Sequence, residues 1–283
     1  MGTALTIGKF DGFHRGHRLL LQEISDYSAK TGAETVCYKL EFGGDGILSH
    51  DEEEKVISSY GINELRRVEF SPEYAAVLAE DFVRDIIHGE LNAEYVVVGS
   101  DFRFGRGRAG DVKMLEELSS KYGFKVKAFD KLVADGEVIS STRIRRLLEE
   151  GRIDEAAGLL GVNYSLTGTV ENGKKLGRNL GYPTVNLPFP ENKILPRLGV
   201  YSSITVIGDS THNSITNVGR RPSVDDGDKV NIETFIYDFS DDIYGREVSV
   251  ELTHFLRDER KFDSLDKLKE QIAIDIENAN RYQ

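Results

Sequence analysis

The sequence has one cysteine, a deficit of positive charge and no long apolar run, and each shortage excludes a class of protein. Cys37 cannot form a disulfide within the chain, and its apolar setting, TVCY, indicates a small buried core residue. The 36 Lys and Arg against 48 Asp and Glu give a net charge of −12, which argues against a nucleic-acid or membrane-surface partner. No run approaches the roughly 20 apolar residues of a membrane span. We therefore expect a cytoplasmic chain without a cleaved leader and without an obligatory protein partner.

The first half alternates short apolar runs with helical patterns, which is typical of βα units winding a parallel sheet. The runs ALTIG, ETVCYKL and EYVVVGS are expected strands. Ser49 stands three residues before Glu52 and should cap a helix, while Gly61 and Gly123 should end helices. At roughly 150 residues per domain, 283 residues suggest about two domains, and we expect the first over residues 1–160.

The second half, expected as a domain over residues 161–283, has a different pattern. A helical stretch, STRIRRLLEEGRIDEAAGLLG, precedes it. The runs YSLTGTVEN, VYSSITVIG, VNIETFIYDF and EVSVELTHFL then alternate at strand period between turn residues, which indicates a small antiparallel barrel or sandwich. A final helix should pack on it through apolar residues at three-to-four spacing: Leu265, Leu268, Ile272 and Ile276.

The segment GKFDGFHRGH follows the first expected strand and places His14 and His17 on the first turn of a helix. Free N–H groups and the helix dipole make such a terminus a natural phosphate site. The alternatives are exposed histidines at a helix start or a metal pair. Because no cysteine or nearby carboxylate set completes a zinc site, we favour phosphate over metal.

A second cluster, GSDFRFGRGRAGD, contributes Arg103, Arg106 and Arg108, and the alternative for such a run is a solvated surface. GRGRAG also matches the GxGxxG dinucleotide pattern, with Asp130 about 20 residues further on. That fingerprint normally opens the helix directly after the first strand, whereas here it follows a late strand. A nicotinamide-dependent oxidoreductase is therefore the least favoured hypothesis.

The third cluster, ISSTRIRRLL, offers Ser140 and Ser141 as caps of a helix whose first turns carry arginines, a combination suited to a polyphosphate. The alternative is a capped amphipathic helix with its arginines in water. Since all three clusters follow ends of expected parallel strands, we expect them to converge on one edge of the sheet.

In that order, GKFDGFHRGH, VVVGSDFRFGRGRAGD and ISSTRIR resemble the flavin-nucleotide adenylyltransferase half of the bacterial bifunctional riboflavin kinase/FAD synthetase family. The resemblance implies an α/β nucleotidyltransferase fold, a Rossmann-like domain with a parallel sheet, that transfers AMP from ATP to FMN and yields FAD and pyrophosphate. It implies catalytic contacts from His14 and His17 to the ATP phosphates. The implied nucleotide-binding residues are Gly8, Lys9, Phe10, Asp11, Gly12, Ser141, Thr142 and Arg145. The implied flavin-binding residues in this half are Asp101, Arg103, Phe104 and Arg108.

Two departures from that family's pattern motivate an alternative. Lys9 stands where the family usually has Asn, and KLEFGG, residues 39–44, stands where it usually has Phe-x-Pro-His-Pro. One alternative hypothesis is therefore a riboflavin kinase whose adenylyltransferase half is degenerate or weak. Another, from a different class, is a non-catalytic flavin-binding module.

In the second half, the glycines of TGTVENGKKLGRNLGYPTVNL precede Thr184 and Asn186. No GxxxxGK[ST] motif occurs, which excludes a Walker-type kinase. Thr184 and Asn186 are two residues apart and would face one side of a strand, where their oxygens suit Mg²⁺, although an ordinary polar strand face would look the same. Glu233 lies in an apolar strand, where a carboxylate most often faces solvent.

The ordered segments GTVENGKKLGRNLGYPTVNL, LPRLGVYSS, NVGRRPSV and ETFIYDF resemble the riboflavin kinase domain of the same family. The resemblance implies a six-stranded antiparallel β-barrel with a C-terminal helix, and transfer of the γ-phosphoryl of ATP to the 5′-hydroxyl of riboflavin. It implies Glu233 as catalytic base, with Phe235 replacing a histidine often found two residues later. Implied ligands of Mg²⁺ and nucleotide are Thr184 and Asn186, with Gly173, Gly177 and Gly181 on the nucleotide and Arg221 on the flavin. The two resemblances together imply a bifunctional enzyme with Mg²⁺ as cofactor, ATP as co-substrate, and riboflavin, FMN and FAD as its other ligands.

Overall fold

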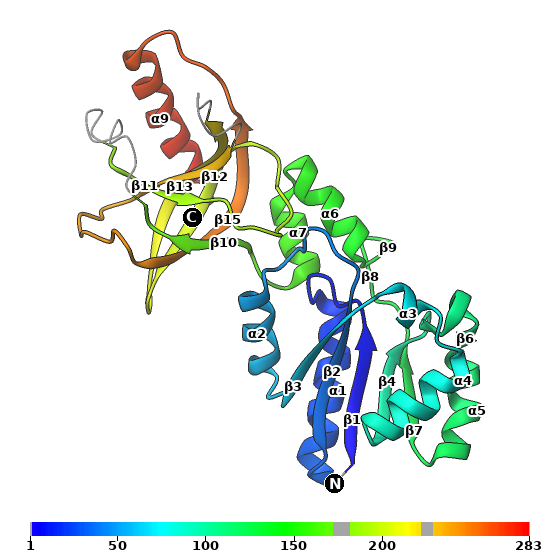
Figure 1. The fold of residues 1–283 in the computed structure, drawn as a ribbon. Helices are drawn as coiled ribbons and strands as arrows, with labels where there is room; N and C mark the ends of the chain where they lie inside the picture. Colours follow the sequence, from blue (N-terminus) through cyan, green and yellow to red (C-terminus); the bar gives the residue numbers. More distant parts are fainter. Residues whose placement is uncertain (1, 172–181, 222–228, 283) are drawn as a thin grey trace. The chain divides into compact units, whose positions relative to one another are not determined.

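Two units make up the chain in the computed structural model, which describes residues 2–171, 182–221 and 229–282 (Figure 1). Residue contacts divide the chain into Met1–Ser141 and Thr142–Gln283. The helix that begins at Ser141 therefore belongs almost entirely to the second unit.

A five-stranded parallel sheet, in the order β3-β2-β1-β4-β7, organises the first unit. Its strands are β1 (Thr3–Gly8), β2 (Glu34–Glu41), β3 (Glu64–Glu69), β4 (Ala93–Gly99) and β7 (Lys125–Phe129). The helices of this unit are α1 (Arg15–Thr31), α2 (His50–Ser59), α3 (Pro72–Ala75), α4 (Ala79–Asp81), the π-helix η1 (Phe82–Glu90), the 3₁₀-helix η2 (Arg106–Arg108) and α5 (Val112–Tyr122). Short strand pairs are β5 (Arg103–Phe104) with β6 (Gly110–Asp111) and β8 (Val133–Ala134) with β9 (Glu137–Val138). The predicted α/β domain with a parallel sheet is confirmed.

Apolar side chains cover both faces of this sheet, as a doubly wound fold requires. On β1, Ala4 packs in the cluster that includes Leu21 and Ile24 of α1. Leu5 packs in the opposite cluster, which includes Val83 of η1. Successive residues of the strand thus pack in hydrophobic cores on opposite faces of the sheet.

The predicted helix ends are also confirmed. The Ser49 N–H donates to Glu52 Oε2 at 2.7 Å and the Glu52 N–H donates to Ser49 Oγ at 3.3 Å, which is a complete capping box at the start of α2. Gly123 ends α5 in the left-handed conformation, with φ 78°, and Gly61 after α2 has φ 65°. Cys37 is fully buried, and burial raises the pKa of its thiol.

The second unit holds a six-stranded antiparallel sheet in the order β10-β15-β12-β13-β14-β11. Its strands are β10 (Tyr164–Thr169), β11 (Thr184–Pro188), β12 (Gly199–Ile207), β13 (Ser210–Arg221), β14 (Lys229–Ile236) and β15 (Glu247–Asp258). The sheet curls so that its two edges approach: the Glu171 N–H, just after β10, donates to the Asn186 carbonyl of β11 at 2.8 Å. This confirms the predicted six-stranded antiparallel architecture.

The stretch between the two sheets is two helices, where the sequence pattern indicated one helical stretch. α6 (Ser141–Glu150) and α7 (Ile153–Leu160) are separated at Gly151, whose φ is 79°. A Cβ there would lie 3.1 Å from Phe255 Cγ on β15, so the chain passes close to the sheet and requires glycine.

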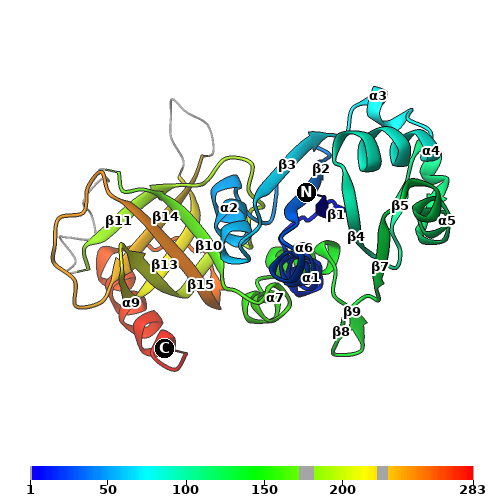
Figure 2. The ribbon, with the colours of Figure 1, turned by 90° about the horizontal axis from the view of Figure 1, so that it is seen from below.

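The predicted C-terminal helix is α9 (Leu265–Ala279), which contacts β12, β13 and β15 (Figure 2). Of its expected apolar contacts, Leu268, Ile272 and Ile276 are half-buried, while the side chain of Leu265 lies outside the described structure. A buried ion pair reinforces the contact: Arg257 Nη2 on β15 lies 2.7 Å from Oδ2 of Asp275, which is only 2 % exposed.

Candidate functional sites

The turn between β1 and α1 has an unusual backbone. Phe10 and Phe13 adopt positive φ angles, 46° and 41°, and Gly12 between them has φ 81°. Both phenylalanine rings are fully buried and stack at 5.5 Å. A positive φ costs a non-glycine residue about 1 to 3 kcal/mol, and strained residues of this kind cluster at ligand-binding sites.

Two hydrogen bonds from distant segments hold this turn. Asp11 Oδ1 accepts from the Ile47 N–H at 3.1 Å, and the Asp11 carbonyl accepts from Ser141 Oγ at 2.8 Å. A Cβ on Gly12 would lie 3.0 Å from Ile47 Cδ1, so a larger residue does not fit there. The structure thus brings Ser141 of the ISSTRIR cluster to the turn.

His14 and His17 form a stacked pair at the start of α1, with ring centroids 3.6 Å apart. Neither Nδ1 atom has a hydrogen-bond partner in the part of the chain that the structure describes. Burial lowers the pKa of His14 to about 4 and that of His17 well below its ordinary value. The imidazoles are therefore neutral at pH 7, and the first N–H groups of α1 beside them suit an anionic ligand.

The other residues predicted for the first half lie in varied surroundings. Gly8 ends β1, and exposed Lys9 follows it. Thr142 and Arg145 fall in the second unit, on α6, where Thr142 is exposed and Arg145 half-buried.

The predicted flavin-binding cluster is mostly exposed. Asp101 pairs with Lys131 at 2.6 Å, and Arg103 donates to the carbonyl of Phe102 at 3.2 Å. Phe104 instead has its ring in the core, 5.6 Å from that of Phe82. Arg108 is exposed, with φ 59°. The GRGRAG segment lies in η2 and β6, separated from β4 by β5, so it does not form the strand-to-helix turn of a dinucleotide fingerprint.

In the second unit the structure brings Asn186 and Glu233 together. They are direct partners across β11 and β14. The amide of Asn231 lies between them, with Nδ2 3.3 Å from Asn186 Oδ1 and 3.4 Å from Glu233 Oε1. Asn186 is 7 % exposed and Glu233 half-buried, so the carboxylate does not extend into open solvent. An amide oxygen beside a carboxylate is a donor set that suits Mg²⁺.

Thr184 lies on the same strand face, since it is two residues from Asn186 and pairs with Phe235 of β14. The Phe235 ring packs edge-on against Tyr182 at 5.3 Å. The position of the expected histidine is therefore part of an aromatic wall next to the polar cluster.

A cavity of about 340 Å³ opens beside Thr184. Its lining includes Val170, Thr184, Ile236, Phe239, Ile243 and Tyr244. Sequence reasoning missed this cavity and also missed Asn231. A signal for Asn231 existed, because it stands two residues before Glu233 and so shares its strand face.

Some predicted residues lie outside the described structure. These are Gly173, Gly177 and Gly181, together with the side chain of Arg221 at the end of β13.

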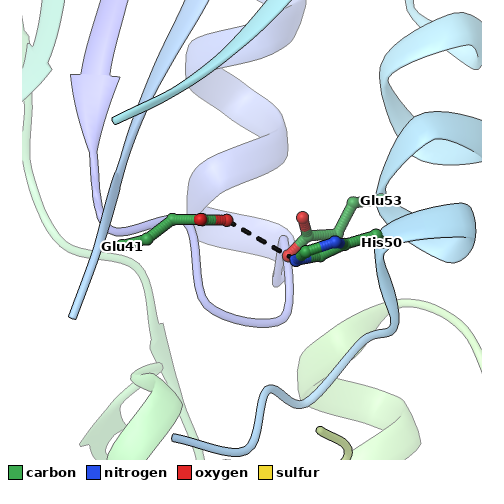
Figure 3. Close-up of side chains that lie close together, drawn as sticks. All are labelled: Glu41, His50 and Glu53. Atoms are coloured by element: carbon green, nitrogen blue, oxygen red, sulfur yellow. Dashed lines mark ion pairs between the residues drawn. The ribbon is translucent and has the colours of Figure 1, made fainter. Parts of the chain in front are cut away.

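Glu41, His50 and Glu53 form a cluster at the end of β2 and the start of α2, with ligand atoms within 4.8 Å of one another (Figure 3). Two cations already occupy it: Lys39 Nζ lies 2.7 Å from Glu53 Oε1, and Arg67 Nη2 lies 3.2 Å from Glu53 Oε2. A divalent metal would have to displace both. We therefore interpret the cluster as an ion-pair network, in which burial raises the pKa of Glu53 despite its two partners.

Within the described residues, no helix has the length and apolar character needed to cross a membrane.

Comparisons with known proteins match the two halves of the chain separately, and the division falls near the one between the two units. A family model described as FAD synthetase matches residues 1–143, and one described as riboflavin kinase matches residues 160–283. The bifunctional riboflavin kinase/FMN adenylyltransferase of Escherichia coli is 34 % identical over 99 % of this chain and 93 % of its own length. The protein of that name from Listeria monocytogenes is 30 % identical over 98 % and 91 %.

A solved structure from Streptococcus pneumoniae, titled a macrolide-efflux protein, superposes with a TM-score of 0.89 at 29 % identity. The match covers all of this chain and 95 % of that one. Its title names an activity that neither family model describes.

Proposed function

This chain belongs to the family of bifunctional riboflavin kinase/FMN adenylyltransferases, and we propose that it carries out both reactions of that name. Its second half phosphorylates riboflavin to FMN with ATP. Its first half transfers AMP from ATP to FMN, forming FAD and releasing pyrophosphate. The observation that supports this most strongly is the meeting of Asn186, Asn231 and Glu233 on one strand face of the riboflavin kinase half.

In the kinase half, Glu233 is the proposed general base. The 5′-hydroxyl of riboflavin is a poor nucleophile, and a carboxylate that accepts its proton as it attacks the γ-phosphorus typically speeds such a reaction by about 10²- to 10⁴-fold. The bond from the γ-phosphorus to the bridging oxygen then breaks and ADP leaves. Asn231, which lies within reach of Glu233 Oε1, would orient the carboxylate.

Thr184 and Asn186 would hold the nucleotide with Mg²⁺, which supplies charge neutralisation to the phosphates when bound. The adjacent cavity has apolar walls from Val170, Ile236 and Ile243. Because Thr184 lines that cavity and also faces the polar cluster, we propose that the purine ring enters the cavity while the phosphates lie toward Glu233.

In the adenylyltransferase half, no general base is required because the FMN phosphate is already an anion. An FMN phosphate oxygen attacks the α-phosphorus of ATP, and the bond to pyrophosphate breaks. The proposed role of His14, His17 and the α1 N-terminus is to hold the phosphates by neutral and backbone donors. Ser141, tied to Asp11, would complete this site, with Thr142 and Arg145 on the polyphosphate. Asp101, Arg103 and Arg108 would bind the flavin, with Phe104 shaping its site from the core.

We also propose the ligands of the enzyme, its compartment, its domain bounds and further binding residues. The ligands are riboflavin, FMN, FAD and ATP, with Mg²⁺, and the enzyme acts in the cytoplasm without an obligatory protein partner. We propose that the adenylyltransferase domain spans residues 1–160 and the kinase domain 161–283. The glycines at 173, 177 and 181 would bind nucleotide and Arg221 would bind flavin.

The departures at Lys9 and at residues 39–44 support one competing proposal, a kinase with a weak adenylyltransferase half. Incubation with ATP, Mg²⁺ and either riboflavin or FMN, followed by chromatography of the flavins, separates the possibilities. The bifunctional enzyme yields FMN and FAD from riboflavin, and FAD from FMN. FMN alone would support the competing proposal, and neither product would indicate a binding module.

A further inference from the structure

Lys9 and Phe42 meet at the carboxyl edge of the parallel sheet. Lys9 follows β1 and directly precedes the strained turn, while Phe42 follows the neighbouring strand β2. The Lys9 ammonium lies over the Phe42 ring, 4.4 Å from its centroid. This is a cation–π contact.

Glu41, the carboxylate next to Phe42 in the chain, has other side-chain partners than Lys9. Glu41, the residue before Phe42, has Oε1 3.3 Å from Lys39 Nζ and 3.7 Å from Arg67 Nε. His50 Nε2 lies 3.6 Å from the same oxygen, and a dashed line marks this pair in Figure 3. Over the described ranges, no carboxylate lies within ion-pair distance of Lys9. Within the described residues, the ammonium thus lies against an aromatic face and has no carboxylate as counter-ion.

The Phe42 ring is itself supported. It stacks on Phe70, just after β3, with centroids 4.5 Å apart and planes 24° apart. Phe70 in turn packs edge-on against Tyr74 at 5.6 Å. Phe42 remains 49 % exposed, so this support fixes its ring at the sheet edge without burying it.

We propose that Phe42 is a positioning residue that holds the Lys9 ammonium for the phosphates of ATP in the adenylyltransferase half. A carboxylate partner would neutralise that charge, whereas an aromatic ring restricts the ammonium and leaves its charge available to an anion. Lys9 and Phe42 belong to two separate departures from the family pattern, and under this proposal the two side chains act together. This inference depends on the proposed adenylyltransferase function.

Steady-state rates of FAD formation from FMN at varied ATP test it. Phe42→Leu should raise the KM for ATP about two- to fivefold, the ratio that corresponds to an exposed cation–π contact, with little change in kcat. Lys9→Met should raise the KM at least as much. Phe42→Leu added to Lys9→Met should have no further effect, because Phe42 acts through Lys9. Phe42→Tyr, which keeps the ring face, should keep the wild-type KM.

Two controls accompany these variants. Riboflavin phosphorylation, measured on the same preparations, should be unchanged and reports that the riboflavin kinase half is folded. Lys113→Met removes a charge from a side chain that is 83 % exposed on α5 and should leave the KM for ATP as it is.

An unchanged KM in Phe42→Leu, or effects of Lys9→Met and Phe42→Leu that multiply in the double variant, would overturn this proposal alone. Absence of FAD from the wild-type chain would overturn the adenylyltransferase function, and this proposal with it. A fall in kcat for both reactions in Phe42→Leu would indicate a structural role and would also contradict the proposal.

Discussion

The stacked histidines at the start of α1 should make the stability of the first unit depend on pH. Burial lowers the pKa of His14 from 6.5 to about 4. In the unfolded chain the same imidazole takes up a proton below pH 6.5, so acid favours the unfolded state. The stabilisation that comes from keeping His14 neutral is complete above pH 6.5 and is lost as the pH falls toward 4.

The size of the effect follows from those two pKa values. Between pH 7 and pH 5 the difference in proton binding to His14 alone should lower the free energy of unfolding by about 2 kcal/mol. His17, whose pKa is also lowered by burial and by the neighbouring ring, should add to this loss.

Urea unfolding followed by circular dichroism at pH 7 and pH 5 measures the effect. His14→Gln should lose about 2 kcal/mol less than the wild type between these two pH values, because the glutamine does not titrate. His88→Gln, at an exposed position in the same unit, is the matched control and should behave like the wild type. Equal pH dependence in His14→Gln and wild type, or an NMR titration of His14 near pH 6.5, would refute the reasoning.

Three further predictions concern the second unit. Asn231→Leu removes the amide between Asn186 and Glu233 and should lower kcat for FMN formation about tenfold. FAD formation from supplied FMN should persist. Equal kcat values for the variant and the wild type in a riboflavin kinase assay would contradict the orienting role of Asn231. Asp275→Asn leaves Arg257 without its buried charged partner and should destabilise this unit by about 3 to 5 kcal/mol, measured by urea unfolding, and a change under 1 kcal/mol would count against the anchoring role. Removal of Mg²⁺ with EDTA should stop FMN formation, and added Mg²⁺ should restore it; turnover that persists in EDTA would contradict the proposed metal role.

Local features of the fold could be predicted from the sequence because short-range chemistry determines them. The capping box joins Ser49 and Glu52, which are three positions apart, and Gly123 ends its helix by its own conformational freedom. By contrast, the apolar spacing of the segment after Ala79 does not distinguish an α-helix from the π-helix η1 that forms there. The break at Gly151 depends on the approach of Phe255, which lies far along the chain.

In the candidate sites, too, local chemistry could be predicted from the sequence, whereas contacts between distant segments could not. The chemical character of Glu233 and Asn186 is visible in the sequence, but their contact depends on the register between β11 and β14, which distant strands determine together. The same holds for Lys9 and Phe42, which become neighbours only because β1 and β2 pair. Arg257 and Asp275 likewise meet only when α9 packs on β15.

Two separate sites act in sequence on the flavin in the proposed enzyme, and a pair of single substitutions tests this most directly. Product analysis with riboflavin, and separately with FMN, should show that Glu233→Gln abolishes FMN formation yet converts supplied FMN to FAD. His17→Ala should do the reverse and accumulate FMN. Loss of both activities in either folded variant, or FMN formation that survives Glu233→Gln at the wild-type rate, would contradict the account.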